Sequence, residues 1–181
     1  MSQHVERMVV GVRLRAPEVE DLPFLYQLEN DPRVWDVCTV LGPLSKTALQ
    51  GMVQETPMIP TATDFRYLAC TVDDPAPLGV IDFFGISWLH RYASLGMIVY
   101  PPEIQGCGWG RKILSEVERF AVRRMQLRHL YLEIQEENRA SQKLFLSAGY
   151  RHLGTKQAWL RNPEGGYSDL LCFQKCLEPK A

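Results

Sequence analysis

A glycine-rich segment, residues 105–112 (QGCGWGRK), lies between an apolar run and an amphipathic stretch and constrains the fold strongly. The apolar run, residues 95–100, predicts a buried strand, because it is short and two prolines follow it. Residues 113–125 place apolar side chains at helical spacing, with charged side chains opposite. A strand, a glycine loop and a helix in this order direct backbone N–H groups at an anion, because glycine permits close approach and the first helical turn has unpaired donors. The sequence therefore predicts an anion-binding loop, to which Arg111 and Lys112 add positive charge.

The spacing of the glycines excludes two common nucleotide-binding loops. A Walker A loop needs Gly-Lys followed by Ser or Thr, whereas Gly110 is followed by Arg-Lys-Ile. The dinucleotide fingerprint needs G-x-G-x-x-G, and the three glycines at 106, 108 and 110 are spaced more closely. A glycine-rich turn without a ligand is the alternative that the loop alone leaves open.

Composition favours one globular domain. The chain has 181 residues, of which 23% are charged and 46% hydrophobic, and this is enough for one core. A net charge of −1 predicts no nucleic-acid partner. We expect no membrane partner and a cytoplasmic location, because no run approaches roughly 20 apolar residues and the N-terminus lacks the apolar core of a signal peptide. Five cysteines without a C-x-x-C pair or a histidine cluster predict reduced thiols and no metal site.

The remaining segments predict a single mixed sheet. Strands are expected near residues 10–15, 65–72, 78–86, 95–100, 129–135, 150–159 and 167–176, and helical segments near 18–29, 33–37, 45–55, 113–125 and 138–148. This order combines an antiparallel first half with a β-α-β crossover after the glycine loop. It is typical of an α/β or α+β domain in which one mostly antiparallel sheet has helices on both faces. We expect one domain, residues 8–177.

This order of elements and two motifs resemble the GCN5-related N-acetyltransferase (GNAT) family. Residues 105–110 resemble its pyrophosphate loop, Q/R-x-x-G-x-G/A, and residues 138–150 resemble its N-x-x-A/S…L-Y-x-x-x-G-F segment. Residues 13–22 (RLRAPEVEDL) resemble the opening L-R-x-x-x-x-x-D-L of the spermidine and diamine acetyltransferase branch. The resemblance extends from about Val12 to Cys176. It implies the family fold, with a central β-α-β crossover that binds acyl-CoA.

The resemblance also implies an activity. The chain is expected to transfer the acetyl group of acetyl-CoA to a primary amine, such as the polyamine spermidine, by direct attack on the thioester. A ribosomal-protein-type N-terminal acetyltransferase is one alternative. A non-catalytic acyl-CoA-binding regulatory domain is another, because Ser94 and Phe145 stand where relatives carry Glu and Tyr. A homo-oligomer is common in this branch and is a further expectation.

Coenzyme A is the expected cofactor, and the resemblance places its site on the central strand, the loop and the later helix. In the family, a backbone N–H on the central strand polarises the thioester carbonyl where the two middle parallel strands separate. The positions that correspond to this site are Met97, Ile98, Val99, Gln105, Gly106, Cys107, Gly108, Trp109, Gly110, Arg111, Lys112, Asn138, Ser141 and Phe145.

The catalytic candidates follow from the chemistry of the amine. An amine with a pKa of roughly 10.4 is almost entirely protonated at pH 7, and it must lose that proton before it attacks. Asp82 and Glu133 are the candidate bases, while Ser94 occupies the position of the family's glutamate. A strand-edge acid facing solvent is an equal interpretation of Asp82. Phe145 replaces the tyrosine that many relatives use to protonate the leaving thiolate.

Acidic residues near the first two helices are candidates for binding a polycationic acceptor. Glu29, Asp31 and Asp36 cluster where the family's first helices cover the substrate, and Trp35 lies among them. A solvated helix end is the alternative interpretation of these acids.

Overall fold

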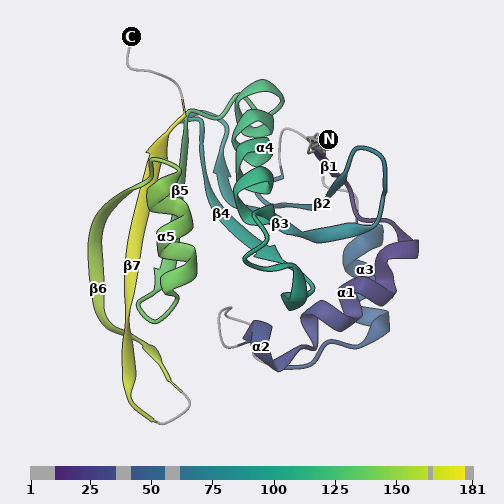
Figure 1. The fold of residues 1–181 in the computed structure, drawn as a ribbon, viewed down its shortest axis with the longest axis horizontal. Coiled ribbons are helices and arrows are strands. Elements are labelled where there is room, and N and C mark those ends of the chain that lie inside the picture. Colours follow the sequence, from purple (N-terminus) through teal and green to yellow (C-terminus); the bar gives the residue numbers. More distant parts are fainter. Residues whose placement is uncertain (1–10, 36–41, 56–61, 163–164, 178–181) are drawn as a thin grey trace, which may run out of the picture.

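The computed structural model describes residues 11–35, 42–55, 62–162 and 165–177 (Figure 1). Its elements in chain order are β1 (Val12–Arg15), the short 3-10 helix η1 (Val19–Asp21), α1 (Leu22–Glu29), α2 (Pro32–Trp35), α3 (Lys46–Gln54), β2 (Phe65–Thr71), β3 (Pro77–Ser87), β4 (Tyr92–Val99), the 3-10 helix η2 (Pro102–Ile104), α4 (Trp109–Arg123), β5 (His129–Gln135), α5 (Arg139–Ser147), β6 (Arg151–Arg161) and β7 (Tyr167–Cys176). The predicted elements are all found, although residue 10 of the first strand and residues 36–37 of the second helical piece lie outside the described residues.

The seven strands form one sheet in the order β1-β2-β3-β4-β5-β7-β6. The β4–β5 pair is parallel, and the other neighbouring strands are antiparallel. Helix α4 makes the crossover between the two parallel strands, as Figure 1 shows. The predicted mixed, mostly antiparallel sheet with a central β-α-β crossover is therefore confirmed.

Helices cover both faces of the sheet and enclose two hydrophobic cores. Alternate residues of β4 separate them: Ala93 and Leu95 join the larger core with α4 and α5, whereas Ile98 packs against the smaller core that contains Leu25 and Leu28 of α1. We call these sides the α4 face and the α1 face. Among the described residues, no helix is long and apolar enough to cross a membrane.

Helix α5 has the ends that its sequence predicts. At its start, the Asn138 side chain accepts a hydrogen bond from Ser141 N at 3.1 Å. At its end, Gly149 has a φ of +90°, and Tyr150 N donates to Phe145 O at 3.0 Å. These bonds form a Schellman motif, which needs a left-handed residue and therefore favours glycine. Both ends fix where the helix lies beside β5.

Strand β4 begins at Tyr92, three residues before the predicted start at residue 95. The additional residues, Tyr92–Ser94, pair in parallel with His129–Tyr131 of β5. The apolar run alone did not indicate them, because Tyr92 and Ser94 face a less buried side of the sheet while Ala93 is buried between them. This short parallel pairing positions the candidate site.

Candidate functional site

Strands β4 and β5 separate in the middle of the sheet. Their pairing ends at Ser94 and Tyr131, although β4 continues to Val99 and β5 continues to Gln135. Figure 1 shows the two strands diverging beyond their shared start. We call the space between the unpaired halves the β4–β5 gap. Its edges are strand edges whose backbone groups lack a neighbouring strand.

The backbone N–H groups of Met97 and Val99 point into the β4–β5 gap. Tyr100 N donates to Leu78 O at 2.9 Å, so these two residues form a hydrogen-bonded pair on the β3 side. Hydrogen-bonded and non-hydrogen-bonded pairs alternate along an antiparallel ladder. In the register of β3 and β4, Ile98 therefore bonds to β3, whereas the N–H groups of Met97 and Val99 point toward β5.

Two glutamine side chains bind backbone carbonyls at the far ends of the gap. Gln105 Nε2 donates to Val99 O at 2.9 Å, at the end of β4. On the other side, buried Gln142 of α5 donates from Nε2 to Gln135 O at 3.2 Å and to Glu136 O at 2.7 Å. Gln142 was not predicted, although a glutamine among the buried positions of an amphipathic helix is the signal that could have identified it.

The glycine loop leads from the β4–β5 gap to the start of α4. Gly106 and Gly108 have φ values of +76° and +87°, which other residues rarely adopt. A Cβ at either position would meet no atom within 4 Å, so the space beside the loop is open. Gly108 is the N-cap of α4, and the N–H groups of Trp109, Gly110 and Arg111 follow in the first turn, where they have no intrahelical acceptor. The loop has the geometry of an anion site.

The third glycine packs α4 against α5. A Cβ on Gly110 would lie 3.2 Å from Leu144 Cδ2, so a larger residue would push the two helices apart. Next to it, Arg111 Nη1 donates to Ser147 Oγ of α5 at 3.0 Å. The two helices are therefore held together at the side of the loop.

The remaining loop residues are accessible. Cys107 is an exposed free thiol between the two left-handed glycines. The ammonium group of Lys112 lies 4.8 Å from the ring centroid of Trp109. Lys112 and Arg111 are both exposed, so their positive charges lie at the open side of the loop.

Phe145 lies in the core, with 4% of its surface exposed. Its ring meets the ring of Tyr150 edge-on, with centroids 5.0 Å apart. The predicted cofactor contacts Asn138 and Ser141 lie at the other end of α5, beside the far end of β5. The helix thus brings Asn138 and Ser141 to the gap but packs Phe145 inside.

Tyr150 is buried next to Phe145, the position that lacks the family's tyrosine. Burial raises the pKa of the Tyr150 phenol, and the nearby Glu118 carboxylate raises it further. The buried hydroxyl lies near Glu118 without an aligned hydrogen bond. Glu118 instead binds Lys175 Nζ at 2.6 Å. The phenol therefore faces a carboxylate on α4.

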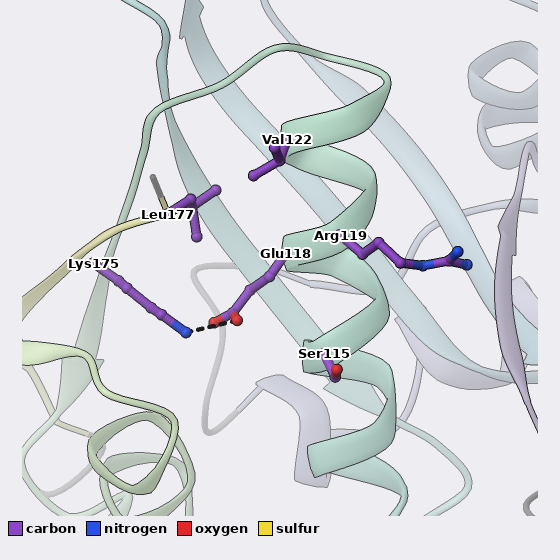
Figure 2. Close-up of a pocket in the computed structure, with 6 residues that line it drawn as sticks. All are labelled: Ser115, Glu118, Arg119, Val122, Lys175 and Leu177. Atoms are coloured by element: carbon purple, nitrogen blue, oxygen red, sulfur yellow. Dashed lines mark hydrogen bonds and ion pairs between the residues drawn. The ribbon is translucent and has the colours of Figure 1, made fainter. Parts of the chain in front are cut away.

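The Glu118–Lys175 ion pair crosses a shallow pocket of about 240 Å³ between α4 and β7 (Figure 2). Figure 2 shows the two side chains pointing toward each other, while Arg119 points away from them. The pocket is lined by Ser115, Glu118, Arg119, Val122, Lys175 and Leu177. None of the predicted site residues lines it, so the pocket is separate from the β4–β5 gap.

On the α1 face, Arg66 holds two of the predicted acids together. Its guanidinium donates two hydrogen bonds to Asp82, with Nε 2.7 Å from Oδ1 and Nη2 3.0 Å from Oδ2. Its Nη1 donates to Glu29 Oε1. Burial lowers the pKa of Arg66, but the hydrogen bonds and charges of Asp82 and Glu29 outweigh it and raise the pKa above its usual value. Sequence reasoning missed Arg66, although a lone charge in an apolar strand was a visible signal.

Asp31 has its own basic partner. Arg33 Nη2 lies 2.7 Å from Asp31 Oδ2, and the backbone N–H of Arg33 donates to Oδ1 at 2.9 Å. The Arg33 hydrogen bonds lower the pKa of Asp31 to about 2. The indole of Trp35 donates to Glu29 O at 2.7 Å, which joins α2 to the end of α1. Asp36 lies outside the described residues.

Glu133 lies on the opposite side of the gap and is also paired. Its Oε1 is 2.5 Å from Lys156 Nζ. The same ammonium lies 4.9 Å from the ring centroid of Trp159. Glu133 and Asp82 therefore come from opposite sides of the gap, and each has a basic partner.

Ser94 lies where the paired part of the sheet meets the gap, among exposed aromatic side chains. It is in register with Phe84 on one side and Tyr131 on the other. The rings of Tyr131 and Tyr92 lie 6.1 Å apart, and all three aromatic residues are partly exposed. This aromatic surface, which sequence reasoning did not predict, can contact the body of a small ligand or face a cation.

Among the comparisons with known proteins, a family model shows the family, and similar solved structures show the fold. A family model described as an acetyltransferase (GNAT) domain matches residues 12–151. Similar solved structures include a spermidine N-acetyltransferase from Vibrio cholerae in complex with CoA and spermine, with a TM-score of 0.81 and 22% identity over 92% of this chain and 95% of that chain. A dodecameric structure of the Vibrio cholerae enzyme in an intermediate state has a TM-score of 0.75 and 21% identity over 92% and 94%. No curated protein matches the sequence.

Proposed function

This chain belongs to the acetyltransferase (GNAT) family and is an acetyl-CoA-dependent N-acetyltransferase, and we propose that its acceptor is a polyamine such as spermidine. The observation that carries the cofactor site is the β4–β5 gap, which opens directly beside the left-handed glycine loop, and the acceptor is proposed from the acids on the α1 face. The gap offers backbone donors to an extended ligand, and the loop offers an anion site next to it.

The residues of the gap and the loop fit coenzyme A. The N–H groups of Met97 and Val99 can bind the amide-containing arm as an added strand. The first turn of α4, with Arg111 and Lys112, can bind the pyrophosphate. When bound, acetyl-CoA supplies an activated thioester. The Met97 N–H is a donor that can polarise a carbonyl held in the gap.

We place the acceptor on the α1 face, because α4 and α5 cover the opposite face. Asp82 and Glu29 together carry two negative charges against the single positive charge of Arg66, which leaves a net charge that attracts a cation. Asp82 is our candidate base, acting directly or through water. It pairs in register with Gly96, and the Phe84 ring packs over this glycine, because a Cβ on Gly96 would lie 3.1 Å from Phe84 Cε2.

The charge and the aromatic surface of the acceptor side together favour an amine over a neutral ligand. Tyr131, Tyr92 and Phe84 can face an ammonium group or an alkyl chain. Ser94, which stands where relatives carry glutamate, contributes no charge. The attraction therefore depends on the Glu29–Arg66–Asp82 group and on Glu133.

A turnover assay tests the proposal. Release of coenzyme A from acetyl-CoA is measured with spermidine, with a short peptide that has a free amino terminus, and without an acceptor. We expect turnover with spermidine and a Michaelis constant that rises with ionic strength, because salt screens exposed charges. Preference for the peptide would favour an N-terminal acetyltransferase. Tight binding of acetyl-CoA without turnover of any amine would favour a regulatory acyl-CoA-binding domain.

Three further expectations are part of the proposal. We place the protein in the cytoplasm, which the free thiols of Cys70, Cys107 and Cys172 support. We propose that the protein forms a homo-oligomer, which is consistent with the exposed edge strand β6. We also propose that the domain spans residues 8–177, of which the family model covers 12–151.

A further inference from the structure

The ammonium group of Lys156 occupies a site formed by a carboxylate and an indole ring. Its Nζ is 2.5 Å from Glu133 Oε1 and 4.9 Å from the ring centroid of Trp159. Trp159 is 59% exposed, so its ring lies largely outside the core and is accessible to a cation. A carboxylate beside an aromatic face is a common receptor for an ammonium ion.

A β-bulge brings Lys156 and Trp159 together. Residues three apart in a regular strand point to opposite faces of the sheet. The register of β6 against β7 shifts between Lys156 and Leu160, which allows the two side chains to meet. Within the bulge, Ala158 has a φ of +46°, and its N–H donates to Asp169 Oδ1 at 2.7 Å. A non-glycine residue in this conformation is unusual, and here a carboxylate holds it in place.

This receptor lies at the edge of the β4–β5 gap. Glu133 is two residues beyond Tyr131, the last residue of β5 that pairs with β4. Two strand residues correspond to about 7 Å. Because side chains alternate along a strand, Glu133 and Tyr131 lie on the same face, which is the face of Ser94. The receptor therefore adjoins the side on which we place the acceptor.

We propose that Glu133 and Trp159 bind a non-reacting ammonium group of the acceptor, and that Lys156 occupies this subsite until the acceptor displaces it. The inference rests on the proposed function and assigns a second contact to the same substrate. Glu133 lies about 7 Å along β5 from the residue at which β4 and β5 stop pairing. This distance suits an ammonium group that is separated from the reacting amine by three or four methylene groups. Lys156 is then a built-in competitor of the acceptor.

The subsite suits the amine that does not react. The hydrogen bond from Lys156 to Glu133 raises the pKa of that lysine above its usual value. An acceptor amine in the same place would be held in its protonated form for the same reason. An attacking amine has to be neutral, so its place is elsewhere, near Asp82.

The experiment compares Lys156→Gln with a matched control, Arg161→Gln. Both substitutions remove one exposed positive charge from β6, but Arg161 is five residues from the subsite lysine. Spermidine and butylamine are titrated calorimetrically into each folded protein without acetyl-CoA. We expect Lys156→Gln to lower the dissociation constant of spermidine about three- to tenfold, because exposed ion pairs and cation–π contacts are of this size. Butylamine has no second ammonium group, so its binding should not change.

A second variant tests the indole. Adding Trp159→Ala to Lys156→Gln should reduce the gain in spermidine affinity, because only the ion pair with Glu133 then remains. The proposal is overturned if Lys156→Gln leaves spermidine binding unchanged or weakens it, if butylamine gains equally, or if Arg161→Gln gives the same gain. These titrations do not depend on turnover. A wild-type protein that acetylates no amine would contradict the proposed function, whereas the titrations would still decide the subsite.

Discussion

Arg66 and Asp82 face each other across β2 and β3 and form two parallel hydrogen bonds of 2.7 and 3.0 Å. They are partners in the strand register, so both side chains leave the same face of the sheet. The same guanidinium binds Glu29, which is 4% exposed, at the end of α1. One cation therefore joins the first helix to the strand that carries the candidate base.

We expect Arg66→Met to lower the free energy of unfolding by about 3–5 kcal/mol, the range found when one partner of a buried ion pair is removed. Methionine keeps much of the volume of the side chain but leaves Glu29 and Asp82 close together without a cation. Urea denaturation followed by circular dichroism measures the change.

Arg33→Met is the matched control for this effect. Arg33 also pairs with an acid, but its side chain is 63% exposed, compared with 26% for Arg66. Arg33→Met leaves a single carboxylate, which still accepts the backbone N–H of residue 33, whereas Arg66→Met leaves two carboxylates close together, so the loss of stability should be smaller. Equal losses in the two variants would show that the burial of the Arg66 group does not contribute.

Gly108→Val should abolish binding of coenzyme A while the domain remains folded. A branched side chain would project into the open space beside the loop, where the anion has to approach the backbone. The φ of +87° adds a strain of about 1–2 kcal/mol for a residue other than glycine. Calorimetric titration with coenzyme A measures the binding.

Gly165→Val separates strain from binding. Gly165 has a φ of +88°, and a Cβ there would also meet no atom within 4 Å, but this glycine lies in the connection between β6 and β7. The two variants should lose similar stability, whereas only Gly108→Val should lose coenzyme A. Undiminished affinity in a folded Gly108→Val protein would contradict the placement of the pyrophosphate.

The sequence predicted those features that depend on local patterns. Short segments of sequence determine the glycine loop, the caps of α5 and the order of the strands. Residue spacing and turn chemistry were therefore sufficient to predict them. The separation of β4 from β5 was expected from the family resemblance, and the register confirms it. Residue spacing alone could not have located it, because it depends on where two distant strands stop pairing.

The partners of the charged residues could not be predicted in this way. Arg66 lies 37 positions from Glu29 and 16 from Asp82, and Lys156 lies 23 positions from Glu133. Such contacts depend on register, and a single bulge changes which side chains meet. The acids near α1 were expected to face a cationic substrate. In the structure, Glu29 and Asp31 instead pair with arginines.

The contribution of Asp31 to stability should depend on pH. Its pKa of about 2 in the folded protein lies below the usual value of 3.8, so its ion pair stabilises the fold above about pH 4 and is lost as the pH falls toward 2. Asp31→Asn keeps the acceptor for the Arg33 N–H but removes the charge. The urea midpoints of wild type and Asp31→Asn should differ at pH 7 and converge toward pH 2. A difference that does not depend on pH would show that the charge of Asp31 is not responsible.

Phe145→Tyr should leave coenzyme A affinity nearly unchanged and either raise turnover or leave it alone. Phenylalanine has no proton to give, so the wild-type rate should lack an alkaline limb due to a tyrosine at this position. General acid catalysis contributes roughly 10²–10⁴-fold where it operates, which sets the upper limit of the gain. Because the ring is 4% exposed, a hydroxyl that finds no partner would cost about 1–3 kcal/mol of stability. Turnover, coenzyme A binding and urea midpoints are measured on the same preparation.

Tyr150→Phe is the control for Phe145→Tyr, because it removes the neighbouring phenol. Its hydroxyl lies near Glu118, on the side of the Glu118–Lys175 ion pair, and has no aligned hydrogen bond. Removing it should therefore leave turnover unchanged and cost little stability. If Tyr150→Phe lowers turnover while Phe145→Tyr has no effect, the phenol of Tyr150 reaches the leaving thiolate after all. If Phe145→Tyr destroys coenzyme A binding, the packing of α5 against the core positions the cofactor, and the alignment of Phe145 with a catalytic tyrosine is wrong.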